Sequence, residues 1–399
     1  MGEAFNSRRE KPVFGNVEKE RTMKATGIRR KFVAVALLGL LALPLAAGCA
    51  GDQGGEGQEP VPEAGQQQEQ AAEREITDMA GRTVVIPTQV DAVYCAVPTG
   101  EAMVATLAPE KIIGWVNEPS EATMEYLPEN LASLPVIGGW MGQEATASME
   151  DIIKLAPDVI VYMSSGSLIS TDEVPDQISQ QTGIPVVCVS SDLDKTAEVY
   201  RTLGDWIGEA ERGEQLATYY EDKFDEVMAK IDAIPESERP TVYYAENADG
   251  LATDPTGSQH TEVLDHCKVV NVADVEMKSG QGRTEVSIEQ VIEWNPEIIL
   301  CHSGFVLADD IMTNPQWADI QAVKDGKVYT TPAIPFNWFD RPPNVMRLLG
   351  IEWFASVCYP SIDIDIEQEV RDFYSLFYNV DLTDEQLQAL LNQDQISFN

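Results

Sequence analysis

Basic side chains and histidine are scarce in this sequence, and common enzyme motifs are missing. The 399 residues contain 27 Lys and Arg against 66 Asp and Glu. An acidic surface of this kind makes nucleic acid and anionic lipid poor partners, and we expect no nucleic-acid partner. The chain has no phosphate-binding loop, no nucleophile elbow and no zincin motif. Nothing in the motifs therefore points to hydrolase or nucleotide chemistry.

The histidines are too few for a bare-metal site. His260, His266 and His302 are the full set, and their spacing fits no usual pattern of metal ligands. We expect His266 and His302 to be structural. Ser303 follows His302, but neighbours at a strand end point in opposite directions, which argues against a nucleophile and its base. We therefore expect no resident metal or cofactor.

Cysteines are also few, and none forms a C-x-x-C pair. Six are present, and one of them, Cys49, belongs to a processing signal described below. An odd number outside the cytoplasm argues against a full disulfide framework, although one bridge stays open. We expect mostly small buried thiols. The five remaining cysteines are Cys95, Cys188, Cys267, Cys301 and Cys358.

The N-terminal 48 residues look like a secretory signal. A basic stretch after Met23 leads into an uncharged apolar run over residues 32–48, which ends in a sequence that resembles a bacterial lipobox. Cys49 would then carry the lipid, with translation starting at Met23. The alternative is a short transmembrane anchor. Residues 49–75 are rich in Gly, Gln and Glu, which predicts a disordered tether. Residues 49–399 carry 18 basic and 62 acidic side chains, a net charge of −44.

One pattern of fourteen residues occurs twice, in residues 148–161 and 287–300. Each copy reads as a capped helix, a turn with proline, and a strand buried on both faces. Ser148 and Ser287 stand at the helix starts as caps. Because one helix-to-strand unit is used twice, we expect two similar α/β lobes with a cleft between them.

The order of elements predicts the fold class and the domains. Strands alternate with helical segments, which favours central, mainly parallel sheets. We expect a first lobe over residues 76–195, with a hairpin over 75–87 and a strand over 112–116. A long interlobe helix follows over residues 196–236, since apolar side chains recur there at helical spacing. A second lobe covers residues 237–399.

The best candidate for ligand contact is the aromatic and basic run over residues 335–343. Trp338 offers a large rigid face, and the Arg341 fork fits carboxylate, phosphate or chelator oxygens. The alternative is an ordinary loop in which Trp338 covers the core and Arg341 pairs with Asp340. Tyr244, at the end of the strand that opens the second lobe, is a further candidate.

His260 and Trp140 complete the predicted contacts. His260 lies in a polar loop at the expected edge of the cleft, where it would bind ligand or make a loop hydrogen bond. Trp140 would form an opposing aromatic wall from the first lobe, or pack in the core. The full set of candidate ligand contacts is Trp140, Tyr244, His260, Asn337, Trp338 and Arg341.

Together, the lipobox, the repeated unit, the interlobe helix and the run from Asn337 to Arg341 resemble substrate-binding lipoproteins of ABC importers. The subgroup is that of the iron-siderophore and cobalamin receptors, and the resemblance covers residues 75–399. It implies a class III periplasmic-binding-protein fold with small closure. It also implies that Glu150 and Glu289 dock onto arginines of the permease. The same two carboxylates would offset the dipole of their helices.

We therefore expect a lipid-anchored, extracytoplasmic and monomeric receptor without enzymatic activity. Its ligand would be a ferric siderophore or similar metal chelate, and its partners an ABC permease with its ATPase subunits. Cobalamin or haem is the first alternative, and an oxyanion such as molybdate the second. Asn337 stands where the cobalamin receptors have an acidic residue. The rival class is a lipid-anchored enzyme that uses the cleft.

Overall fold

The computed structural model describes residues 72–141, 144–278 and 282–392. The expected signal region, the lipidation site Cys49 and nearly all of the expected tether lie outside the described residues. Among the residues that are described, no helix combines the length and the apolar character needed to cross a bilayer. The folded body that follows is one compact unit.

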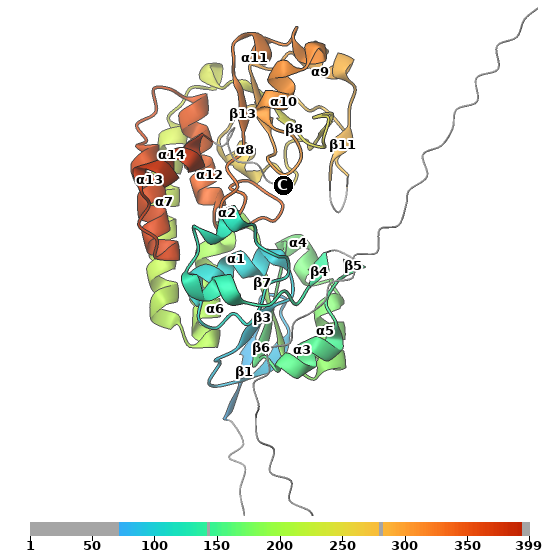
Figure 1. The fold of residues 1–399 in the computed structure, drawn as a ribbon, viewed down its shortest axis with the longest axis vertical. Helices are drawn as coiled ribbons and strands as arrows, with labels where there is room; N and C mark the ends of the chain where they lie inside the picture. The colour runs from blue at the N-terminus through green and yellow to red at the C-terminus, as the bar shows by residue number, and fades with distance from the viewer. Residues whose placement is uncertain (1–71, 142–143, 279–281, 393–399) are drawn as a thin grey trace, which may run out of the picture. The chain divides into compact units, whose positions relative to one another are not determined.

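The first lobe is built on a parallel sheet of three strands (Figure 1). The strand order is β3 (Val93–Cys95), β6 (Val159–Ser164) and β7 (Val186–Ser190). Val93 pairs with Val159, and Ile160 pairs with Val186. Almost all of these side chains are buried, because helices cover both faces of the sheet.

Two predictions for the start of the chain have different outcomes. The hairpin is confirmed: β1 (Glu73–Thr77) and β2 (Thr83–Pro87) pair antiparallel. The strand expected over residues 112–116 is wrong. Only isolated parallel bridges form there, from Ile112 to Val93 and from Trp115 to Val136.

The repeated unit folds as expected in both lobes. α3 (Met149–Leu155) leads to β6, and α9 (Ile288–Trp294) leads to β12 (Ile298–Cys301). Ser148 Oγ accepts the amide of Asp151 at 3.3 Å, and Ser287 Oγ accepts that of Gln290 at 3.2 Å. The caps therefore fix the same helix start in each lobe.

The second lobe is built on a parallel sheet of four strands. Their order is β10 (Val270–Asn271), β8 (Thr241–Ala245), β12 and β13 (Val328–Thr330). β8 and β12 are buried along almost their whole length, and their carboxyl ends point to one edge of the sheet. Ligand sites in open parallel sheets lie at such an edge.

The single interlobe helix predicted over residues 196–236 is wrong. Two helices occupy this stretch, α6 (Thr196–Ile207) and α7 (Ala210–Asp232), and they pack against each other. The break is at Gly208, whose φ of 84° is a left-handed conformation that glycine adopts at little cost. Of these two helices, α7 is the one that runs from one lobe to the other (Figure 1).

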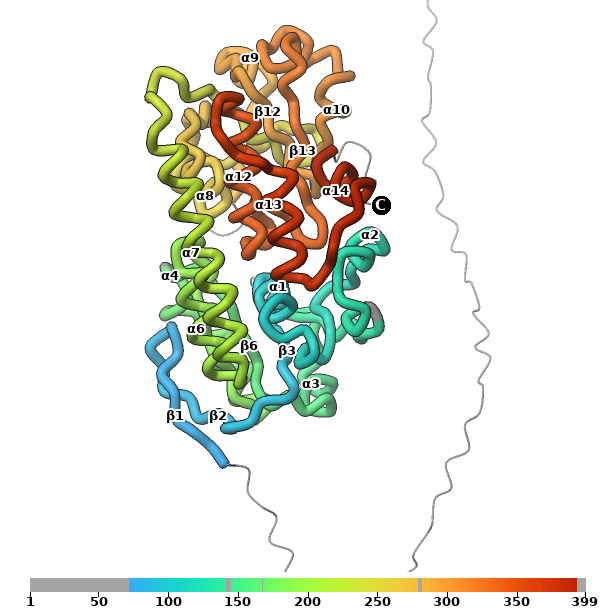
Figure 2. Tube along the Cα trace, turned by 90° about the vertical axis from the view of Figure 1, so that its left-hand side faces the viewer, coloured from blue at the N-terminus to red at the C-terminus, as the bar shows by residue number. Residues whose placement is uncertain are grey.

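The C-terminal helices connect the lobes on the side of α7 (Figure 2). They are α12 (Arg347–Cys358), α13 (Ile366–Phe373), a π-helical turn η5 (Tyr374–Tyr378) and α14 (Asp384–Leu391). α12 packs on α7, while η5 packs on α1 (Pro98–Leu107) of the first lobe. One hydrophobic cluster consequently extends through the first lobe and these helices. A smaller cluster fills the outer part of the second lobe.

The remaining elements are short and lie in the connections. In the first lobe they are α2 (Glu121–Met124), η1 (Glu129–Ser133), β4 (Trp140–Met141), β5 (Glu144–Ala145), α4 (Gly166–Ile169), α5 (Val174–Thr182) and η2 (Leu193–Lys195). In the second lobe they are η3 (Glu236–Glu238), β9 (Ala252–Thr253), α8 (Glu262–His266), β11 (Thr284–Glu285), α10 (Ala308–Thr313), η4 (Pro315–Trp317) and α11 (Gln321–Lys324).

Candidate functional site

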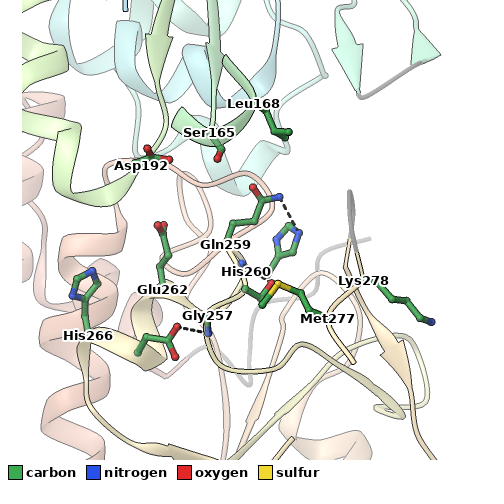
Figure 3. Close-up of a pocket in the computed structure, with 12 residues that line it drawn as sticks. Ser165, Leu168, Asp192, Gly257, Gln259, His260, Glu262, His266, Met277 and Lys278 are labelled. Carbon is green, nitrogen blue, oxygen red and sulfur yellow. Dashed lines mark hydrogen bonds between the residues drawn. The ribbon is translucent and has the colours of Figure 1, made fainter. Parts of the chain in front are cut away.

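A cavity of about 570 Å³ lies between the two lobes (Figure 3). Ser165, Leu168 and Asp192 line it from the first lobe. The second lobe contributes the loop before α8, α8 itself and the segment after β10. Its lining residues are Gly257, Ser258, Gln259, His260, Glu262, Asp265, His266, Met277 and Lys278. The volume falls within the range of about 300–1,000 Å³ that is usual for sites of small ligands.

Carboxylates dominate the charge of the cavity wall. Asp192 Oδ1 accepts the amide of Gly166 at 2.9 Å, and Asp265 Oδ2 accepts that of Gly257 at 2.9 Å. Glu262 is bonded to a buried arginine. Burial raises the pKa of Asp265, although the amide of Gly257 works against the shift. Among the described residues that line the cavity, the exposed Lys278 is the one lysine, so this part of the wall is acidic.

His260 connects the cavity to a buried carboxylate. Its side chain is 8% exposed, and its Nδ1 lies 2.5 Å from Oδ2 of Asp340, which is 1% exposed. Burial lowers the pKa of His260, but the hydrogen bond and the charge of Asp340 outweigh this and raise the pKa overall. Burial likewise opposes ionisation of Asp340, but His260 keeps the pKa of Asp340 below its usual value. The two side chains therefore form a buried hydrogen-bonded pair in which each favours the charged form of the other.

Arg341 is held by three carboxylates. Its Nε donates to Glu246 Oε1 at 2.8 Å, its Nη2 donates to Asp254 Oδ2 at 2.9 Å, and Asp340 Oδ2 lies 3.3 Å from Nε. All three carboxylates are almost fully buried. Burial raises the pKa of Glu246 to about 7, and Arg341 limits the shift. The φ of Arg341 is 56°, a conformation that is uncommon outside glycine.

The structure separates the predicted ligand contacts into three groups. His260 lines the cavity, as expected. Arg341 does not line the cavity but contacts Asp340, which in turn bonds the lining residue His260. Trp338 is a correction: it is fully buried, and its Nε1 donates to the carbonyl of Ile334 at 3.1 Å. Its ring therefore packs in the core instead of facing the cavity, and the alternative weighed above describes it.

Asn337, Trp140 and Tyr244 are also buried. Asn337 Oδ1 accepts the amides of Phe339 and Asp340, so its side chain shapes the loop. Trp140, 7% exposed, packs in the core of the first lobe and does not line the cavity. Tyr244 is fully buried below the carboxyl end of β8. The predicted aromatic wall is thus not formed by Trp140.

Ser303 and His302, which were not expected to act as nucleophile and base, both bond other groups. Ser303 Oγ accepts a hydrogen bond from the side-chain Nδ2 of Asn337 at 3.1 Å and lies 3.2 Å from Thr331 Oγ1. His302 Nδ1 accepts the amide of Gly304 at 3.1 Å. Burial lowers the pKa of His302 to about 4, so its ring is neutral. Within the described ranges, no group of three or more His, Cys, Asp or Glu side chains could hold a metal ion.

Glu150 and Glu289 occupy equivalent places in the two lobes. Each is exposed in the first turn of its helix, α3 or α9. Both helices lie on the side of the molecule away from α7 (Figure 1). The expected docking carboxylates are therefore accessible to a partner.

Sequence reasoning missed most of the buried charges. Glu246 and Asp254 were not singled out, although Glu246 follows an apolar strand directly, which is the available signal for a buried carboxyl. Arg347 was also missed. It is 2% exposed, bonds Glu262 and donates to the carbonyl of Ser191 in the other lobe at 2.6 Å. Its position after Pro343 gave no sign of this role.

Comparisons with known proteins agree with this geometry. The family model described as "Periplasmic binding protein" matches residues 120–335. An ABC transporter solute binding protein from Sulfurospirillum deleyianum is 32% identical, with a TM-score of 0.73 over 79% of this chain and 98% of that one. The molybdate-binding protein MolA of Haemophilus influenzae is 29% identical over 77% of this chain and 91% of its own length. The Fe(3+)-citrate-binding protein YfmC of Bacillus subtilis is 22% identical over 47% of this chain and 58% of its own.

Proposed function

Because the chain belongs to the periplasmic binding protein family, we propose that its interlobe cavity captures a metal chelate and delivers it to an ABC permease. The family match confirms the resemblance to substrate-binding proteins of ABC importers that the sequence indicated. It also confirms the two-lobed α/β fold and the extracytoplasmic localisation. The protein is a solute-binding component of an ABC transporter. The identity of the solute is the proposal.

The observation that carries the proposal is the size and charge of the cavity. Its volume of about 570 Å³ suits a chelate much larger than a single oxyanion. Asp192 and Asp265 give the wall an acidic character, while Glu262 is paired with Arg347, and this acidity disfavours a strongly anionic ligand by direct repulsion. A ferric hydroxamate siderophore is neutral or cationic, whereas a ferric catecholate carries several negative charges. We therefore place ferric hydroxamates first.

Molybdate is the second candidate, because the relative named for molybdate binding matches 77% of this chain. A bare oxyanion would need cationic partners in the cavity. Lys278 is available at the wall, but Arg341 is already neutralised by Glu246, Asp254 and Asp340. A contact between molybdate and Arg341 would therefore require Arg341 to exchange carboxylate partners. The ferric chelate requires no such exchange.

Further parts of the proposal concern the setting of the receptor. A lipid on Cys49 would hold the monomeric protein at the outer face of the membrane. Glu150 and Glu289 would dock onto the permease, and the cavity would perform no covalent chemistry. The exposed places of these two carboxylates in equivalent helix starts support the docking role. Cobalamin and haem remain as chelates to be tested.

A fluorescence titration of residues 72–399 tests the proposal. The panel is ferric hydroxamate, ferric catecholate, ferric citrate, cobalamin, haemin and molybdate. We expect saturable, submicromolar binding of the hydroxamate and weaker binding of the catecholate. Tight binding of molybdate with no response to any iron chelate would replace the first candidate with the second. Release of a chemically altered ligand would support the enzyme alternative.

A further inference from the structure

Buried polar atoms that lack a partner gather in one place in the second lobe. More than half of those found in the described part of the chain are here. Each is a side-chain atom with almost no exposed surface and no hydrogen-bond partner in the protein. They are Tyr244 Oη, Glu246 Oε2, Thr253 Oγ1, His302 Nε2 and Asp340 Oδ1. We call these five residues the unpaired cluster.

The members of the unpaired cluster come from separate segments and converge on Arg341. Glu246 and Asp340 bond the guanidinium directly, and Thr253 precedes Asp254, which also bonds it. The rings of Tyr244 and His302 have centroids 6.1 Å apart. These contacts place the unpaired atoms around the carboxyl ends of β8 and β12, where Asp340 connects the cluster to His260 in the cavity wall.

Such a concentration is unfavourable unless something fills it. A buried donor or acceptor without a partner loses its hydration and gains no bond in return, so almost all such groups in native proteins are bonded to protein or ordered water. Loop strain does not account for the set, because Tyr244 lies in β8 and His302 directly follows the last residue of β12. The cluster therefore has the composition of a binding site.

The chemistry of the unpaired atoms defines the occupant. His302 Nδ1 accepts the amide of Gly304, so the neutral ring carries its proton on Nε2 and can only donate there. Tyr244 and Thr253 bring hydroxyl groups, which donate readily. Asp340 Oδ1 can only accept, because Asp340 is an ionised carboxylate. Glu246 is a separate case, because a proton shared between Glu246 and Asp254 would give Glu246 Oε2 a hydrogen-bond partner within the protein.

A site with both donors and acceptors restricts the ligand. A bare oxyanion only accepts and would be repelled by Asp340. A bare cation can be approached by the oxygens of Tyr244 and Asp340, but it accepts no hydrogen bond from the N–H of His302. We propose that the unpaired cluster binds O–H groups, supplied either by ordered water or by a hydroxyl or metal-bound water of the captured chelate. An O–H oxygen accepts from Tyr244 or His302 and donates to Asp340 at the same time.

Two adjacent tyrosines of β8 provide a matched test. Both are fully buried, but Tyr243 Oη donates to the carbonyl of Gly250 at 2.8 Å, whereas Tyr244 Oη has no protein partner. In ligand-free protein, Tyr243→Phe should lower the melting temperature by about 2 °C. If water occupies the cluster, Tyr244→Phe lowers it by a similar amount. If no water occupies the cluster, removing the unsatisfied hydroxyl of Tyr244 leaves the melting temperature unchanged or raises it. Thr253→Val, which keeps the side-chain shape, should follow Tyr244→Phe.

A second arm distinguishes the two sources of the O–H group, and this arm rests on the proposed function. The probes are ferric nitrilotriacetate, which keeps water on the iron, and a hexadentate ferric hydroxamate, which does not. If the cluster takes metal-bound water, Tyr244→Phe weakens binding of the first probe by about tenfold and spares the second. If it holds its own water, both affinities stay unchanged while stability falls.

One result overturns the inference. It is a Tyr244→Phe protein whose melting temperature is unchanged or raised and which binds both probes as the wild type does. Failure of the wild type to bind either probe would count against the proposed function alone, because the stability arm needs no ligand. A crystal structure of ligand-free protein gives the direct reading: water within hydrogen-bond distance of Tyr244 Oη supports the first source.

Discussion

Arg347 donates from Nη2 to the backbone carbonyl of Ser191, 2.6 Å away, and so bonds a side chain of the second lobe to the backbone of the first. The same guanidinium bonds Glu262, which lines the cavity. Asp192, another lining residue, follows Ser191 directly. One buried side chain therefore sets the positions of lining residues from both lobes.

Replacing Arg347 should weaken both the fold and the cavity. Arg347→Met leaves Glu262 partly buried without its cation and removes the interlobe bond. We expect a loss of about 2–3 kcal/mol in the free energy of unfolding, below the full figure for buried pairs because the Glu262 side chain is 29% exposed. Urea denaturation measures it. Arg201→Met is the control: Arg201 makes only exposed ion pairs, so its loss should cost under about 1 kcal/mol. Equal losses in the two variants would contradict the role of Arg347.

Trp338 and His260 should give opposite results. Trp338→Phe removes the bond to the carbonyl of Ile334 within the core and should cost about 1–2 kcal/mol of stability with little change in ligand affinity. The backbone of Trp338 is also packed closely against α12, because a Cβ at Gly350 of that helix would overlap the carbonyl oxygen of Trp338. His260→Gln alters the cavity wall and should weaken binding of the ferric hydroxamate. Denaturation and titration of both variants decide the matter. If Trp338→Phe lost ligand affinity at unchanged stability, the result would show that Trp338 contacts the ligand.

The docking carboxylates should act on transport and not on capture. Glu150→Ala combined with Glu289→Ala is expected to abolish uptake in cells while leaving the dissociation constant of the ligand unchanged, because both side chains are exposed at helix starts. Loss of their interaction with the helix dipoles should cost under about 1 kcal/mol each. Asp151→Ala with Glu293→Ala, on the same two helices, is the control. Normal uptake in the first double variant would remove the docking role.

Cys49 carries the prediction about anchoring. Cys49→Ser should release the protein from membranes, because lipidation at that thiol would supply the chains that hold it there. Fractionation of cells, with detection of the protein in the membrane and soluble fractions, is the measurement. The serine variant in the membrane fraction at wild-type levels would favour the transmembrane alternative.

Local signals in the sequence were sufficient for the repeated unit. Ser148 and Ser287 cap their helices by bonds that depend on residues three positions apart, so spacing alone predicts them. Gly208 shows the limit of such signals. A glycine inside a helical pattern either continues the helix or ends it, and here the packing of α6 against α7 decides.

The candidate site was harder to predict because its contacts join distant segments. Glu246, Asp254 and Asp340 are separated by up to 94 positions, yet all three bond Arg341. The sequence shows that Trp338 and Arg341 are near each other along the chain, but not which of them faces the core. His260 could be placed because polar loops with glycine lie at the ends of strands. Its partner Asp340 could not.

Glu101 provides a prediction about pH. It is 4% exposed in α1 of the first lobe, and burial raises its pKa to about 8, although the amide of Val116 opposes the shift. The folded state therefore holds this proton more tightly than the unfolded state. The contribution of Glu101 to stability is fully present below its ordinary pKa of about 4.5 and is lost as the pH rises through about 8. Between pH 5 and 8 the loss in the free energy of unfolding should be roughly 1 kcal/mol per pH unit.

Glu101→Gln keeps an acceptor for the amide of Val116 and should flatten the pH dependence of stability measured by urea denaturation. Glu110→Gln, at an exposed position, should keep the wild-type slope. Identical slopes in all three proteins would show that Glu101 is not the titrating group.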